Sequence, residues 1–147
     1  MMRVLLPLPV VLPLLAAGLS MASARRRWLQ RIIGITTLSV TTAVSVAILV
    51  QVDRHGPAAA FMGGWDAPVG IAVVADRFTG LMLVVASPVL LAVLVFAIGQ
   101  PGTEDEQPAF HPVYLVLAAG IGLAFLTGDL FNLFVAFEMM LTASYVL

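Results

Sequence analysis

The C-terminal stretch from Val113 to Leu147 reads VYLVLAAGIGLAFLTGDLFNLFVAFEMMLTASYVL and contains two charged residues, Asp129 and Glu138. Its 35 residues would form a helix about 52 Å long, whereas the hydrocarbon core of a bilayer is about 30 Å thick. We expect one break at Gly128-Asp129, because glycine tolerates turn geometry and aspartate is costly in lipid. The stretch therefore predicts two membrane-spanning helices, Val113–Thr127 and Leu130–Leu147.

Three further apolar stretches without charges precede this pair. They have 19, 19 and 21 residues and comprise Val4–Ala22, Ile32–Val50 and Phe78–Ile98. The chain as a whole is 61% hydrophobic and 10% charged, with a mean hydropathy of +1.08, which is typical of a membrane protein. We predict an all-α protein that crosses the cell membrane about five times as a single membrane domain over residues 1–147.

The connections between these stretches indicate an orientation. Arg25, Arg26, Arg27 and Arg31 lie between the first two stretches, and arginine-rich loops stay on the cytoplasmic side, which places the N-terminus outside. Residues 99–111 form a water-exposed loop in which Pro101 and Pro108 bracket an acidic triplet. The first 24 residues imitate a cleavable secretory signal, but the long apolar run and the arginines after it favour a retained span.

Several classes of function are disfavoured by composition. The chain has seven arginines, no lysine and a net charge of -1, which does not suit a nucleic-acid binder. Cysteine is absent, and His55 and His111 lie far apart in sequence, so we expect no metal site. No glycine-rich phosphate loop or nucleophile motif is present, so we expect no cofactor and no chemistry on a small molecule.

Glu138 is the most informative single residue. Eight residues of its predicted span precede it and nine follow, which places the carboxyl group near the bilayer midplane. Such a carboxylate is costly unless it is protonated or paired, so acids within membranes are candidates for ion or proton pathways. Its helical neighbours are Phe134, Thr142 and Tyr145, so we expect any counter-charge to come from outside this chain. A neutral acid at a helix contact is the structural alternative.

Other polar residues are weaker candidates for an ion pathway. Asp129, Asn132 and Thr142 lie on or beside the last span. Asp129 is also well placed to cap that helix, which is the simpler explanation for an acid at a helix start. Asp76 and Arg77 precede the third span and are expected to form an adjacent pair that anchors its depth.

The stretch Phe125–Glu138, FLTGDLFNLFVAFE, resembles a signature of the D subunit of Mrp-type multi-subunit monovalent cation (Na⁺)/H⁺ antiporters. Supporting stretches are GGWDAPVGI at 63–71, ADRF at 75–78 and FHP at 110–112. The wider superfamily includes the antiporter-like membrane subunits of NADH:quinone oxidoreductase, respiratory complex I.

This resemblance implies that Glu138 corresponds to an essential glutamate on the fifth helix, which works with a lysine on the seventh. Family members have about fourteen helices with internal repeats, so the chain ends before the central lysine-bearing helices. We therefore expect a truncated antiporter subunit whose partners are other membrane subunits, lipid, protons and monovalent cations. The alternatives are a proton-pumping subunit of a complex I-like enzyme and an inactive structural or assembly fragment.

Overall fold

A computed structural model describes residues 2–62, 70–100 and 109–147 of the chain. The helices are α1 (Met2–Leu5), α2 (Leu8–Ala22), α3 (Arg27–His55), α4 (Arg77–Gly99), α6 (Phe110–Leu126) and α7 (Leu130–Val146), and the strands are β1 (Ala58–Met62) and β2 (Ile71–Ala75). The predicted connection at 63–68 and most of the predicted acidic loop, 101–108, lie outside the described residues.

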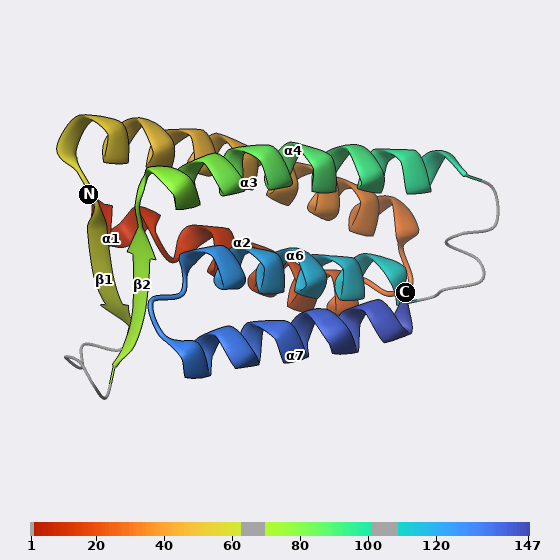
Figure 1. The fold of residues 1–147 in the computed structure, drawn as a ribbon. Helices are drawn as coiled ribbons and strands as arrows, with labels where there is room; N and C mark the ends of the chain where they lie inside the picture. Colours follow the sequence, from red (N-terminus) through yellow and green to blue (C-terminus); the bar gives the residue numbers. More distant parts are fainter. Residues whose placement is uncertain (1, 63–69, 101–108) are drawn as a thin grey trace.

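Five long helices lie side by side and run alternately in opposite directions (Figure 1). Helix α6 is central, because it contacts α2, α3, α4 and α7, while α3 pairs with α4 and α2. The N-terminus, the strands and the α6–α7 connection lie at one end of this bundle, and the α2–α3 turn and the C-terminus lie at the other. The predicted helical architecture is confirmed in these five helices.

The helix bounds differ from the predicted spans at three places. Helix α6 begins at Phe110, three residues before the predicted start at Val113, so Phe110 and His111 belong to this helix rather than to the predicted loop 99–111. The first apolar stretch is not one helix, because it breaks at Leu6-Pro7; proline lacks an N–H and disfavours helical geometry in the residue before it. Helix α3 exceeds the predicted 32–50 range and ends at Gly56, whose φ of 84° terminates it. Helices α3 and α4, with 29 and 23 residues, are long and apolar enough to cross a membrane, whereas α2, α6 and α7 are shorter apolar helices.

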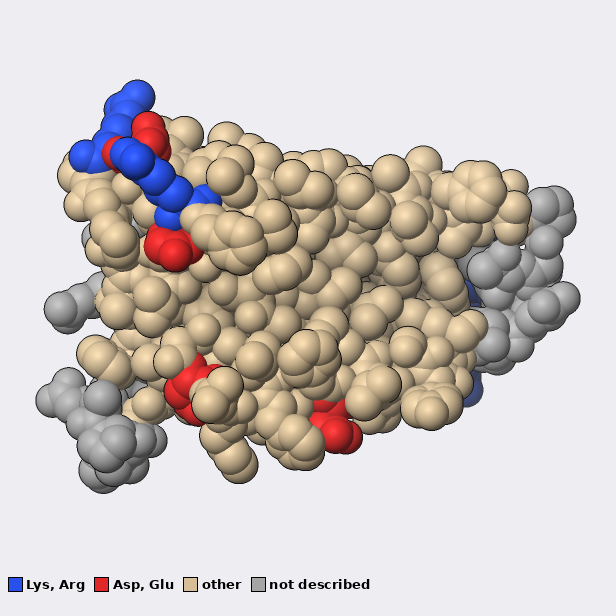
Figure 2. Space-filling model, viewed as in Figure 1, with Lys and Arg blue, Asp and Glu red and all other residues tan. Residues whose placement is uncertain are grey.

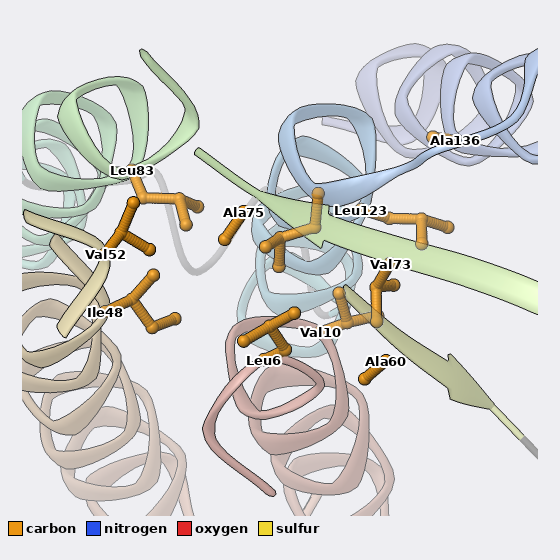
Figure 3. Close-up of a cluster of buried hydrophobic side chains, with 11 residues drawn as sticks. Leu6, Val10, Ile48, Val52, Ala60, Val73, Ala75, Leu83, Leu123 and Ala136 are labelled. Carbon is orange, nitrogen blue, oxygen red and sulfur yellow. The ribbon is translucent and has the colours of Figure 1, made fainter. Parts of the chain in front are cut away.

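A two-stranded antiparallel hairpin, which the sequence analysis did not predict, accompanies the helices. Strands β1 and β2 pair with Ala58 opposite Ala75 and Ala60 opposite Val73. An isolated hairpin is marginal in water, but Val73 and Ala75 are fully buried in a cluster with side chains from the ends of several helices. Figure 3 shows this cluster. The hairpin therefore owes its stability to helices that are distant in sequence, which local patterns do not reveal.

Strand β2 also holds the connection between α6 and α7. The Gly128 N–H donates to the Ala72 carbonyl over 2.8 Å, and Val73 bridges Thr127. A Cβ atom at Gly128 would lie 2.7 Å from the Val74 Cγ2 atom and 3.3 Å from the Ala72 carbonyl oxygen. The predicted break at Gly128-Asp129 is thus present, and glycine is needed there mainly because β2 approaches so closely.

The expected pairing of Asp76 with Arg77 is wrong. The Arg77 Nε atom lies 3.0 Å from the Asp53 Oδ1 atom at the end of α3, and both side chains are largely exposed. Asp76 instead caps α4, since its Oδ1 atom accepts a hydrogen bond from the Thr79 N–H over 2.7 Å. The pair formed by Arg77 and Asp53 therefore joins α3 to α4 at the hairpin end, but an exposed ion pair contributes little to stability.

The Asp76 cap makes a testable contribution to the start of α4. We expect Asp76→Ala to cost about 1 kcal/mol locally, lowering hydrogen-exchange protection of the first α4 amides about fivefold in the complete protein. The hydrogen bond from the Thr79 N–H lowers the pKa of Asp76 below its ordinary 3.8. The stabilisation is therefore full above about pH 3.8 and is lost as the pH falls through the lowered pKa.

Asp76→Asn is the matched control for this experiment, because asparagine caps a helix about as well and does not titrate. At neutral pH, the hydrogen-exchange protection of the first α4 amides in Asp76→Asn is expected to equal that in the unmodified protein. Equal protection in Asp76→Ala and the unmodified protein would show that the cap is dispensable.

Candidate ion-pathway site on helix α7

Helix α7 starts with a capping group. The Asp129 Oδ1 atom accepts hydrogen bonds from the backbone N–H groups of Phe131 and Asn132 over 2.7 and 3.1 Å, and the Thr127 hydroxyl donates to the Asp129 carbonyl over 3.0 Å. This geometry matches the capping explanation for Asp129. The side chain is exposed at the hairpin end, so a role in ion entry stays a prediction.

One face of α7 packs tightly against α6. Its buried residues are Asn132, Ala136 and Ala143. A Cβ atom on Gly120 of α6 would lie 2.9 Å from the Met140 Cγ atom and 3.4 Å from the Ala136 carbonyl oxygen. The missing side chain thus lets the two helices approach closely, as small residues do between membrane helices. The Asn132 side chain is 5% exposed, and its Nδ2 atom has no hydrogen-bond partner among the described residues.

Glu138 lies on the opposite face of the same helix. It is the central residue of α7, with eight helical residues on either side, and it is exposed. It follows buried Ala136 by two positions, a rotation of about 200° around the helix axis. Figure 2 shows acidic atoms on the α7 side of the molecule surrounded by uncharged residues. The carboxyl group therefore points away from α6, toward surface that the described chain leaves open.

The surroundings of Glu138 are apolar and aromatic. Three large side chains on the same face as Glu138 are exposed. They are Phe134 (60% exposed), four residues before Glu138, and Leu141 (51%) and Tyr145 (88%), three and seven residues after it. Thr142, one turn later, shares this exposed face. The structure thus places Thr142 beside Glu138, whereas Asn132 faces α6 and Asp129 lies about 14 Å away along the axis. The four predicted pathway residues do not form one cluster.

Glu138 has no ion pair or hydrogen bond among the described residues. The arginines whose side chains the structure describes all lie near helix ends: at both ends of α3, at the start of α4 and in the α2–α3 turn. A carboxylate at the centre of an apolar helix can bind and release a proton or a cation, provided that other groups share its charge. Those groups would have to reach the open face of α7.

Three buried hydroxyl groups were not predicted as part of any site. Thr41, Ser45 and Ser87 line a small pocket of about 10 Å³ between α2, α3, α4 and α6. Each hydroxyl donates to the carbonyl four residues earlier in its own helix, over 2.7 to 2.9 Å. The signal in the sequence was the run of serines and threonines between residues 36 and 45. Because their donors are satisfied locally, these hydroxyls are compatible with an apolar interior.

Comparison with known proteins agrees with the earlier resemblance. The chain is 41% identical over 146 residues to the D subunit of a Na⁺/H⁺ antiporter from Alkalihalophilus pseudofirmus, and 39% identical to a Staphylococcus epidermidis protein named as antiporter subunit mnhD2. The chain is thus homologous over its whole length to part of these two proteins. These alignments cover 99% and 100% of the chain but 30% and 29% of the relatives. No family model matches the sequence.

Two solved structures share this fold. A chain of the Mrp complex from Dietzia sp. superposes with a TM-score of 0.89 and 36% identity, covering 95% of this chain and 26% of that chain. A chain of an archaeal respiratory membrane complex, the membrane-bound sulfane sulfur reductase, gives a TM-score of 0.86 and 26% identity, covering 99% of this chain and 30% of that one. The chain therefore has the fold of a part, 26% and 30% respectively, of these two longer membrane-complex chains.

Proposed function

We propose that the chain forms part of a subunit of a multi-subunit Na⁺/H⁺ antiporter, in which Glu138 binds a proton or a cation near the middle of the membrane. The observation that carries the proposal is the position of Glu138, central in α7 and turned away from α6. The similarity to a Na⁺/H⁺ antiporter subunit over nearly the whole chain supports it.

The open face of α7 indicates where partners of the chain would bind. Exposed aromatic and aliphatic side chains surround Glu138, and large exposed apolar patches mark contacts with protein or lipid. The chain spans about 30% of the relatives it matches. The remainder of a longer subunit, together with other membrane subunits, would cover this face and supply the positive charge that Glu138 requires.

The arrangement of helix ends supports a definite orientation within the proposal. The arginines at 25–31 and the N-terminus lie at opposite ends of the bundle (Figure 1). With Arg25–Arg31 in the cytoplasm, as the positive-inside rule favours, the N-terminus, the hairpin and Asp129 face outward. Thr142 and Asn132 remain candidates for a path that links Glu138 to the two sides.

A second candidate function rests on the likeness to a respiratory membrane complex. In that case the chain belongs to a proton-pumping subunit of a complex I-like NADH:quinone oxidoreductase, and Glu138 takes part in proton movement that is driven by electron transfer. The chain has no cysteine for iron-sulfur ligation, so redox centres in such an assembly would lie on other subunits.

Everted membrane vesicles distinguish the two functions. The complete protein and its partner subunits are expressed in a host that lacks its own Na⁺/H⁺ antiporters, and a pH-sensitive dye follows an acid-inside gradient. We expect added NaCl to collapse this gradient only in vesicles that contain the assembly. A gradient that does not respond to Na⁺, but that NADH oxidation with quinone reduction forms only in vesicles that contain the assembly, would favour the second function. If neither response depends on the assembly, a structural or assembly role remains.

A further inference from the structure

An open groove runs between α2, α6 and α7 at the end of the bundle that holds the α2–α3 turn. Its volume is about 340 Å³. The groove residues that matter here come from all three helices and are Leu14, Gly18, Met21, Val116, Thr142 and Val146. Apart from the Thr142 hydroxyl these side chains are apolar, so the groove suits a hydrocarbon chain better than a polar ligand.

Gly18 borders open space in this groove. A Cβ atom at Gly18 would meet no heavy atom within 4 Å, whereas one at Gly122 or Gly128 would lie within 3 Å of a neighbour. Leu14 and Met21, on the same side of α2, are 40% and 66% exposed. The missing side chain therefore leaves a gap in a wall that is otherwise made of long apolar side chains.

Two exposed arginines follow the groove at its end. Met21 lies in the last turn of α2, which ends at Ala22, and the turn that follows carries Arg25 and Arg26. From Leu14 to Met21 the groove extends about 10 Å along the helix axis. An apolar groove with exposed arginines four and five residues beyond Met21 suits a ligand with a long hydrocarbon tail and an anionic head.

We propose that this groove binds an acyl chain of an anionic phospholipid, with the lipid phosphate held by Arg25 and Arg26. Arginine donates pairs of hydrogen bonds to phosphate oxygens, and basic pockets between membrane helices recognise anionic head groups. The anionic lipids of the cytoplasmic leaflet also meet the arginine turn in the orientation proposed above. The lipid site itself does not depend on the transport activity.

Native mass spectrometry of the complete protein in its assembled complex tests this site. The purified complex is stripped of lipid and titrated with phosphatidylglycerol or phosphatidylcholine, and bound lipids are counted. We expect the Gly18→Phe side chain to fill the groove. The variant complex should then bind one phosphatidylglycerol molecule fewer than the unmodified complex, whereas the number of bound phosphatidylcholine molecules should be equal in the two. Gly99→Phe is the matched control, because a Cβ atom at Gly99 also meets nothing within 4 Å and Gly99 lies outside the groove.

A second variant tests the head-group contact without altering the groove. Replacing both arginines, Arg25→Gln with Arg26→Gln, is expected to raise the phosphatidylglycerol concentration for half-occupancy at least threefold. Equal lipid counts in Gly18→Phe and the unmodified complex, or equal retention of the two lipids, overturn the proposal. Gly18→Phe would block assembly if a protein helix fills the groove. In that case the double arginine variant tests the lipid site, and unchanged phosphatidylglycerol binding in that variant refutes it.

Discussion

Replacing Glu138 with glutamine is expected to reduce coupled Na⁺/H⁺ exchange to the background of vesicles without the assembly. Glutamine has nearly the same size and hydrogen-bonding shape as glutamic acid, but its side-chain amide does not titrate. Because Glu138 is central in α7 and points away from α6, the change should leave the α6–α7 contact intact. Exchange is measured as the Na⁺-induced loss of an acid-inside gradient in everted vesicles.

Two further variants make the result specific to the carboxyl group. Glu138→Asp keeps a titratable acid on a shorter side chain and should retain part of the exchange. Asp129→Asn removes a charge but keeps a helix cap, so it should stay near the unmodified rate if Asp129 only caps α7; a loss would assign Asp129 to the pathway. Normal exchange in an assembled Glu138→Gln complex would refute the proposed role of Glu138.

Gly122→Ala is expected to destabilise the protein, although alanine normally favours a helix over glycine by about 1 kcal/mol. A Cβ atom at Gly122 of α6 would lie 2.9 Å from the Pro9 carbonyl oxygen and 3.3 Å from its carbonyl carbon. These are backbone atoms of α2, so relief requires the two helices to separate. Overpacking of this kind costs about 1 to 3 kcal/mol, which exceeds the gain in helix propensity.

Gly18→Ala is the matched control, because it makes the same substitution in α2 where a Cβ atom meets nothing within 4 Å. The thermal midpoint of the complete protein in detergent, followed by size-exclusion chromatography after heating, should fall for Gly122→Ala and stay equal or rise for Gly18→Ala. Equal midpoints for the two variants would show that α2 and α6 are not held as closely as described.

Length and hydropathy along the chain were enough to predict the five long helices. The 35 residues after Pro112 cannot cross a bilayer once as a straight helix, so a break at Gly128-Asp129 followed from the chain itself. The central position of Glu138 within α7 followed in the same way, because it depends only on distances along one helix. The transmembrane ranges and the orientation stay predictions.

Tertiary structure alone decided the contacts between residues that are far apart in sequence. The hairpin is stabilised by helix ends packed around Val73 and Ala75, and Arg77 reaches Asp53, 24 residues earlier, rather than its neighbour Asp76. The face on which Glu138 lies was also not predictable, because nearly every side of α7 is apolar and periodicity gives no preferred direction. Local sequence fixes where helices form, whereas close packing between distant segments determines which faces meet.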